Sequence, residues 1–224
     1  MPMRVMLIHA MHESMAPIHR AFAQLWPEAR IFDVLDSSLA VDHAADAGRL
    51  GPKMVKRFRV LGRYAAAAGP EGAGSDAVLF TCSAFGGAID AVKRDRAIPV
   101  LRPNEAAFAE ALKIGSRIAV LVSFEPSRGA LAAELAEMAH QRGQVVEISA
   151  VLVADALAAL QAGDGAGHDR AVAHAAASLQ DVDVIVLGQF SMACAAEAVR
   201  AAVSVPVLTT PESAVMALRA LLAP

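Results

Sequence analysis

A cysteine at the junction of two expected elements is the most reactive side chain that the sequence offers. In FTCSAFGG, residues 80 to 87, an apolar run typical of a β-strand leads into a helix, and Cys82 lies at the change. Free N–H groups and the helix dipole stabilise an anion at a helix start, so we expect a lowered pKa for this thiol. Four small residues after it, Ser83, Ala84, Gly86 and Gly87, leave room for a small ligand. Cysteine is also often buried, so a packing role is the alternative.

A histidine group near the N-terminus is the second candidate for chemistry. His9 ends the apolar run RVMLIHA, and the motif HAMHE places His12 and Glu13 close behind it. An imidazole at a strand end could orient Cys82, take its proton or act as a second base, whereas a structural histidine is the alternative. The H-E-x-x-H spacing of a helical zinc site is absent and no Cys/His cluster is evident. We therefore assign no metal ligand.

Small polar residues follow most of the apolar runs. Hydroxyl and amide side chains at helix starts suit a carboxylate held by N–H and O–H groups, although serine and threonine are also ordinary helix caps. We expect a small anionic ligand near these residues: Ser14, Thr81, Ser83, Ser123, Gln189, Ser191, Thr209 and Thr210.

The elements that position these residues follow an alternating order. Eight short β-rich runs, apolar on both faces, are separated by alanine-rich stretches of helix length, which predicts parallel strands covered by helices. The runs lie at residues 4–10, 30–35, 76–81, 98–101, 117–123, 145–150, 182–187 and 205–210. Residues 35 to 51 look like a long loop, either a lid or a disordered connection. We expect a solvated helix face over residues 53 to 63, and His168 and His174 facing solvent.

An internal repeat divides the chain into two similar halves. Residues 76–107 align with residues 183–214 without a gap, and the shared features include an aspartate at each start and the tripeptide Pro-Val-Leu. The class is therefore α/β, with two similar Rossmann-like lobes related by a pseudo-twofold axis. We expect residues 1–101 plus 206–224 in lobe one and residues 102–205 in lobe two. Because ligands bind at the carboxyl ends of parallel strands, we expect the active site in the cleft between the lobes.

Composition limits the partners. A net charge of −3 over 224 residues, with no basic stripe, argues against a nucleic-acid partner. No run of 18 uncharged apolar residues is present, so we expect no membrane association and a cytoplasmic location. The two cysteines, Cys82 and Cys194, lie far apart, which favours free thiols.

Two motifs of the sequence resemble those of a known family. VLFTCSAFG, paired with IVLGQFSMA in a two-lobed α/β repeat, is similar to the aspartate/glutamate/hydantoin racemase superfamily, which includes arylmalonate decarboxylase and maleate isomerase. The resemblance covers nearly the whole chain. It implies a cofactor-independent enzyme that acts at the Cα of a small carboxylic acid, usually as a homodimer. It also implies one cysteine from each lobe on opposite faces of the substrate, with one thiolate removing the proton and the other thiol returning one.

One position departs from the family pattern. The repeat places Gln189 opposite Cys82, where the family has its second cysteine, and an amide is neither an acid nor a base at neutral pH. Cys194 aligns with Gly87, and we expect it inside the following helix, turned away from the strand end. Three functions stay open: an amino-acid racemase with Cys82 and His9 as its catalytic residues, a one-cysteine decarboxylase or cis-trans isomerase, and a non-catalytic protein that binds a small acid.

Overall fold

Two compact units make up the chain in this computed structural model. The structure describes residues 2–70 and 73–223. The first unit comprises Met1–Pro103 and Ala214–Pro224, and the second comprises Asn104–Ser213. None of the helices in the described ranges is long and apolar enough to cross a membrane.

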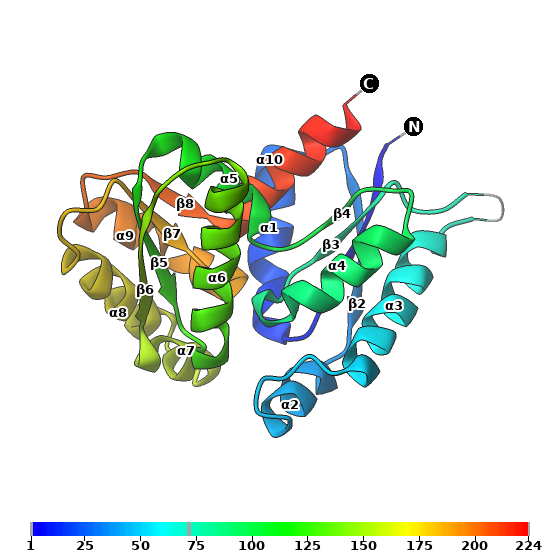
Figure 1. The fold of residues 1–224 in the computed structure, drawn as a ribbon, viewed down its shortest axis with the longest axis horizontal. Helices are drawn as coiled ribbons and strands as arrows, with labels where there is room; N and C mark the ends of the chain where they lie inside the picture. The colour runs from blue at the N-terminus through cyan, green and yellow to red at the C-terminus, as the bar shows by residue number, and fades with distance from the viewer. Residues whose placement is uncertain (1, 71–72, 224) are drawn as a thin grey trace. The chain divides into compact units, whose positions relative to one another are not determined.

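The first unit is built on a four-stranded parallel sheet in the order β2-β1-β3-β4 (Figure 1). Its strands are β1 (Arg4–His9), β2 (Arg30–Leu35), β3 (Ala77–Phe80) and β4 (Val100–Leu101). Its helices are η1 (His12–Ser14), α1 (Met15–Leu25), α2 (Ser38–Ala45), α3 (Pro52–Ala67), η2 (Ser83–Phe85) and α4 (Gly86–Asp95), where η marks a 3₁₀ helix. Because crossovers between parallel strands are right-handed, α1 covers one face of the sheet, and α3 and α4 cover the other.

Close packing joins α3 to α4 on their shared face of the first sheet. Gly62 of α3 is buried, and a Cβ atom at this position would lie 2.3 Å from Cγ1 of Val92 in α4. Phe58 of α3 stacks on Phe80 at a centroid distance of 5.3 Å and meets Phe85 at 4.9 Å. This aromatic group therefore packs the end of β3 and the end of η2 against α3.

The second unit repeats the same sheet with the order β6-β5-β7-β8. Its strands are β5 (Arg117–Val122), β6 (Glu147–Leu152), β7 (Val184–Leu187) and β8 (Val207–Thr209). Its helices are α5 (Glu105–Ile114), α6 (Glu125–Gln141), α7 (Ala154–Gln161), α8 (Gly165–Ala177), η3 (Phe190–Ala195) and α9 (Ala196–Ala202), and α10 (Thr210–Leu222) runs from this unit into the first. The eight strands that the apolar runs predict are thus confirmed.

Alternation along the strands gives the second sheet two cores. Ala119 and Leu121 of β5 pack with residues of α8, η3 and α9. Ile118, Val120 and Val122, on the other face of the same strand, pack with residues of α5 and α6. Successive side chains of a strand point to opposite faces, so a strand covered on both sides reads as one apolar run.

The repeat extends to the polar contacts at the strand starts. An Asp76 carboxylate oxygen accepts a hydrogen bond from the backbone N–H of Arg4 at 2.6 Å. Asp183 does the same for the N–H of Arg117 at 2.8 Å. The aspartate that begins each copy of the repeat therefore joins the start of one strand to the start of its neighbour in the sheet. The prediction of two similar units is confirmed.

The segment expected to be a loop, residues 35 to 51, contains helix α2. Leu39 and His43 are both buried, and the imidazole of His43 lies 4.8 Å from the ring of Phe85. Their i, i+4 spacing gives this short helix one buried face, a signal that the abundance of Ser, Asp and Ala in the segment obscures. Arg57 of α3 binds Asp36 and Asp42 and so ties this segment to α3.

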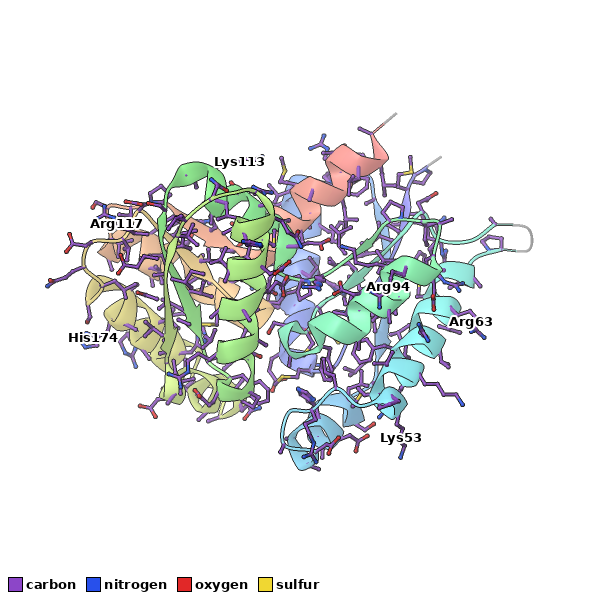
Figure 2. All side chains as sticks on the ribbon, in the orientation of Figure 1. Lys53, Arg63, Arg94, Lys113, Arg117 and His174 are labelled. Carbon is purple, nitrogen blue, oxygen red and sulfur yellow. The ribbon has the colours of Figure 1, made fainter. Side chains whose placement is uncertain are left out.

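The predicted basic helix face over residues 53 to 63 is confirmed. These residues belong to α3, and the side chains of Lys53 and Arg63 are exposed (Figure 2).

Candidate functional site

The carboxyl end of the first sheet brings His9 and Thr81 together. β1 and β3 are neighbours, and Ile8 pairs with Phe80 in their register, so the next residue of each strand emerges at the same edge. The backbone N–H of Thr81 donates to the carbonyl oxygen of Ile8 at 3.0 Å, which extends the ladder by one residue. Cys82 follows Thr81 directly.

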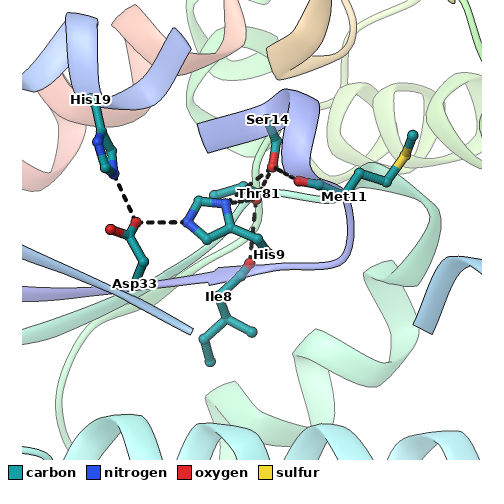
Figure 3. A network of polar contacts seen from close by, with 7 residues as sticks. All are labelled: Ile8, His9, Met11, Ser14, His19, Asp33 and Thr81. Carbon is teal, nitrogen blue, oxygen red and sulfur yellow. Dashed lines mark hydrogen bonds and ion pairs between the residues drawn. The ribbon is translucent and has the colours of Figure 1, made fainter. Parts of the chain in front are cut away.

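His9 is the centre of a buried polar network (Figure 3). Its Nε2 atom lies 2.9 Å from a carboxylate oxygen of Asp33, and its Nδ1 atom lies 2.8 Å from Thr81 Oγ1 and 3.0 Å from Ser14 Oγ. The two hydroxyl oxygens lie 2.9 Å apart, and Ser14 donates to the carbonyl oxygen of Met11 at 2.7 Å. The network joins the ends of β1 and β3 to η1.

The protonation state of His9 follows from its surroundings. Burial lowers the pKa of His9, and the nearby Asp33 carboxylate only partly opposes this effect. A neutral imidazole that donates from Nε2 to Asp33 leaves Nδ1 as an acceptor for the Thr81 hydroxyl. His19 from α1 shares the same Asp33 oxygen, at 2.8 Å. With both ring nitrogens bonded to protein groups, His9 is placed to orient the strand ends.

Cys82 is half-buried and caps the start of η2 with an extended backbone. Burial raises the pKa of its thiol to about 11, and a hydrogen bond from the backbone of Ala84 only partly opposes this effect. The prediction of a lowered pKa is therefore wrong. The physical reason is that a three-residue turn aligns few peptide dipoles, while the loss of solvent around the sulfur penalises the thiolate. The resting group is a protonated thiol at neutral pH.

Gln189 occupies the matching position in the second unit. It caps η3 with an extended backbone, as Cys82 caps η2, so the alignment of these two residues by the repeat holds in the fold. Its side-chain oxygen accepts two hydrogen bonds from Ser123, from the backbone N–H at 2.6 Å and from the hydroxyl at 2.9 Å. Since the oxygen is held in this way, the amide NH₂ group is the end that can donate to a ligand.

The other predicted binding residues are mostly buried. Ser83 lies in η2, and Ser191 is half-buried in η3, where its carbonyl oxygen accepts from the Cys194 thiol at 3.1 Å. Thr209 ends β8 and accepts from the N–H of Glu212 at 3.3 Å. Thr210 begins α10, and among the described residues its hydroxyl has no hydrogen-bond partner.

Sequence reasoning missed Asp33 and Asn104. Asp33 is the only acidic residue of the strand RIFDVL, and that interruption of an apolar run was the signal that could have found it. Asn104 is fully buried, donates to the carbonyl oxygen of Gly188 at 2.9 Å, and keeps a buried oxygen without a partner in the described part of the chain. It thereby fixes the backbone just before Gln189.

His168 differs from its prediction, whereas Cys194 lies in the helix that follows the strand, as expected. His168, expected to face solvent, is fully buried on α8, while His174 is exposed as expected (Figure 2). Cys194 lies in the 3₁₀ helix η3 and is half-buried, with its sulfur 3.5 Å from His168 Nδ1. Helical periodicity explains the difference, because His168 shares the inward face of α8 with Val172 and Ala176. Among residues 2–70 and 73–223, only these two and Asp169 form a group with metal-ligand spacing.

Comparison with solved structures gives the fold a context. Glutamate racemase from Francisella tularensis, in complex with D-glutamate, matches with a TM-score of 0.72 and 13% identity, over 98% of this chain and 81% of that one. Allantoin racemase from Pseudomonas fluorescens matches with a TM-score of 0.66 and 19% identity, over 98% of this chain and 90% of that one. Aspartate racemase from Picrophilus torridus matches with a TM-score of 0.71 and 13% identity, over 98% of this chain and 94% of that one.

Sequence comparison places the chain in a family. None of the curated proteins searched matches it. The model of the Asp/Glu/Hydantoin racemase family, however, matches residues 13–218, which is most of the chain and includes both copies of the repeat. The chain therefore belongs to the Asp/Glu/Hydantoin racemase family.

Proposed function

We propose that this protein is a racemase-type isomerase that transfers a proton at the Cα of a small carboxylic acid, with Cys82 as the acid/base group. The observation that carries the proposal is the position of Cys82, beyond the carboxyl end of a central parallel strand in a chain of the racemase family. Ligands of open α/β sheets bind beyond these strand ends.

The state of the thiol determines which half of the reaction the resting protein supports. With a pKa of about 11, Cys82 holds its proton and can donate it to a carbanion at Cα. Removal of a substrate proton requires the thiolate, so a racemase must first move that proton from sulfur to another group. Our candidate for receiving it is His9, whose neutral imidazole lies 2.8 Å from the hydroxyl of Thr81, the residue before Cys82.

Polar groups at the strand ends suit the substrate carboxylate. We assign this role to Ser14, Thr81 and Ser83 in the first unit and to Ser123, Gln189, Ser191, Thr209 and Thr210 in the second. The amide of Gln189 supports the assignment best, because Ser123 holds its oxygen and leaves its NH₂ group to donate. Resemblance to the family further leads us to propose that the enzyme needs no cofactor, and that it works as a homodimer in the cytoplasm.

A second candidate is a one-cysteine lyase or isomerase acting on a small dicarboxylic acid. The observation that favours it is Gln189, an amide at the position that matches Cys82. Loss of carbon dioxide leaves a carbanion that a single protonated thiol can quench on one face, and the raised pKa of Cys82 suits that task. A third candidate, a non-catalytic protein that binds a small acid, needs only the hydrogen-bond donors.

Deuterium exchange separates the three candidates. Single enantiomers of aspartate and glutamate, and a substituted malonic acid, are incubated with the protein in D₂O. Deuterium at Cα with loss of configuration supports the racemase. Exchange with retention, or release of carbon dioxide with one product enantiomer, supports the one-cysteine enzyme and overturns the racemase. If neither deuterium exchange nor carbon dioxide release occurs, and Cys82→Ala binds ligands as well as the unmodified protein, the binding protein is supported.

A further inference from the structure

Three side chains with different ligand atoms meet in the second unit. His168 and Asp169 come from α8, and Cys194 comes from η3. One nitrogen, one carboxylate oxygen and one sulfur lie within 4.8 Å of one another. The imidazole Nδ1 is 2.8 Å from the Asp169 oxygen and 3.5 Å from the sulfur.

The spacing fits a single bound ion. Zinc binds sulfur at about 2.3 Å, nitrogen at about 2.0–2.1 Å and carboxylate oxygen at about 2.0–2.2 Å. Ligands at these lengths around one tetrahedral ion lie roughly 3–4 Å apart, so shifts of up to about 1 Å bring all three donors within range. Thiolate and imidazole favour Zn²⁺ and other thiophilic ions over Mg²⁺ or Ca²⁺.

Electrostatics of the cluster also favour a cation. A divalent ion binds a thiolate directly, and its two charges balance one thiolate and one carboxylate. The imidazole directs its polar contacts to this cluster through Nδ1, while its buried Nε2 atom has no partner among the described residues.

We propose that His168 Nδ1, Asp169 and Cys194 Sγ form a binding site for a thiophilic divalent cation, with Zn²⁺ as the best match. Binding releases the thiol proton to solvent, and the imidazole carries its remaining proton on Nε2. Water or the carbonyl oxygen of Ser191, which lies 3.1 Å from the sulfur, supplies the fourth ligand. The ion joins α8 to η3, the helix that Gln189 caps, so it stiffens the segment next to that residue.

A titration with Cd²⁺ tests the site without any substrate. In Cys82→Ser protein, Cys194 is the only thiol, and a sulfur-to-cadmium charge-transfer band is expected to saturate at one ion per chain. Adding Cys194→Ser is expected to abolish the band. Adding His168→Gln is expected to weaken binding at least about tenfold, because a direct ligand matters no less than its supporting partners. His174→Gln is the matched control, since His174 lies on the same helix and is exposed.

Two results would overturn the site. One is a band that forms equally in the His168→Gln and His174→Gln proteins, and the other is no band in the parent Cys82→Ser protein. If His168→Gln fails to fold, a measurement on the parent decides instead. Stoichiometric Zn²⁺ is expected to slow the reaction of Cys194 with a disulfide reagent at least about tenfold, and an unchanged rate rejects the site.

Discussion

At the scale of single residues, Cys82 lies at a position typical of a reactive cysteine, but its raised pKa keeps the thiol protonated at neutral pH. The family pattern and the strand-end position favour a catalytic thiol, whereas burial of the sulfur favours a protonated one. A catalytic role and a protonated resting state are compatible if the thiol acts first as a proton donor. The residue is therefore suited to general acid chemistry in the resting protein and needs a bound substrate or a neighbouring base to form its thiolate.

Alkylation rates test this raised pKa. In a Cys194→Ser protein, iodoacetamide reacts only with the Cys82 thiolate. The rate is expected to rise about tenfold per pH unit from pH 7 to 10 and to level off near pH 11, following the thiolate fraction. Liquid chromatography with mass detection gives the rate at each pH. A plateau by pH 8 would show that the thiol is activated without substrate and contradict this account.

Asp33 is predicted to stabilise the fold through His9. Asp33→Asn removes the charged partner of a buried imidazole and is expected to lower the free energy of unfolding by about 1–3 kcal/mol at pH 7. The control, His19→Gln, removes the exposed partner of the same carboxylate and is expected to change it by less than about 0.5 kcal/mol. Urea denaturation measures both changes in the free energy of unfolding. Equal losses would show that the contact of Asp33 with His9 contributes no more than its contact with His19.

The pH dependence has a definite sign. His9 has a lowered pKa in the folded protein, so the unfolded chain binds more protons once the pH falls below its ordinary value of 6.5. Stability is therefore expected to fall from pH 7.5 to pH 5. Asp33→Asn removes a group that raises this pKa and is expected to steepen the fall, whereas a shallower fall would contradict the assignment of a neutral His9.

Residue types and spacing predicted the candidate site only in part. Cys82, Gln189 and Ser123 follow apolar runs, and a local pattern is enough to place such residues at strand ends. The contacts of His9 with Asp33 and of His168 with Cys194 join residues far apart in the sequence, and only the fold brings them together. The pKa of Cys82 depends on how completely its surroundings exclude water, which no spacing encodes.

At the scale of elements, helix packing explains why a helix-weakening residue sits inside α3. Gly62→Ala is expected to destabilise the protein by about 1–3 kcal/mol, despite the better helix propensity of alanine, because the added methyl group meets Val92. Gly129→Ala in α6 is the control: a Cβ there meets nothing within 4 Å, so a gain of up to about 1 kcal/mol is expected. Thermal unfolding reports both changes.

A second substitution checks that this contact is the cause. Combining Gly62→Ala with Val92→Ala frees the space that the new methyl group needs, so the double variant is expected to lose less stability than the sum of the two single changes. Additive losses would mean that Gly62 serves another purpose in α3.

Elements were largely predictable because each strand of a parallel sheet is covered on both faces and reads as a continuous apolar run. Ile118–Val122 shows this well, since its alternate residues enter two different cores. Helix α2 escaped prediction because Leu39 and His43 alone form its buried face, and one of them is polar. Such a short pattern does not stand out from a loop rich in Ser, Asp and Ala.

At the scale of the whole molecule, the two units share one fold but carry different side chains at matching positions. The strand orders match, and Cys82 and Gln189 cap corresponding turns with similar backbones. Supporting contacts differ, since His9, Ser14 and Thr81 form the strand-end network of one unit, while Ser123 holds Gln189 in the other. The two units thus place different side chains at corresponding positions, and this asymmetry raises the question whether the protein has one acid/base group or two.

The central claim is that Cys82 transfers the proton at Cα, and exchange of the Cα proton in D₂O tests it most directly. With the substrate that exchanges fastest, Cys82→Ala and Cys82→Ser are each expected to lower the rate at least about a hundredfold, the usual contribution of a general acid or base. Circular dichroism and unfolding midpoints confirm that the variants are folded, and Gly129→Ala provides the active control. Folded Cys82 variants that exchange the Cα proton at the rate of the unmodified protein would contradict the account.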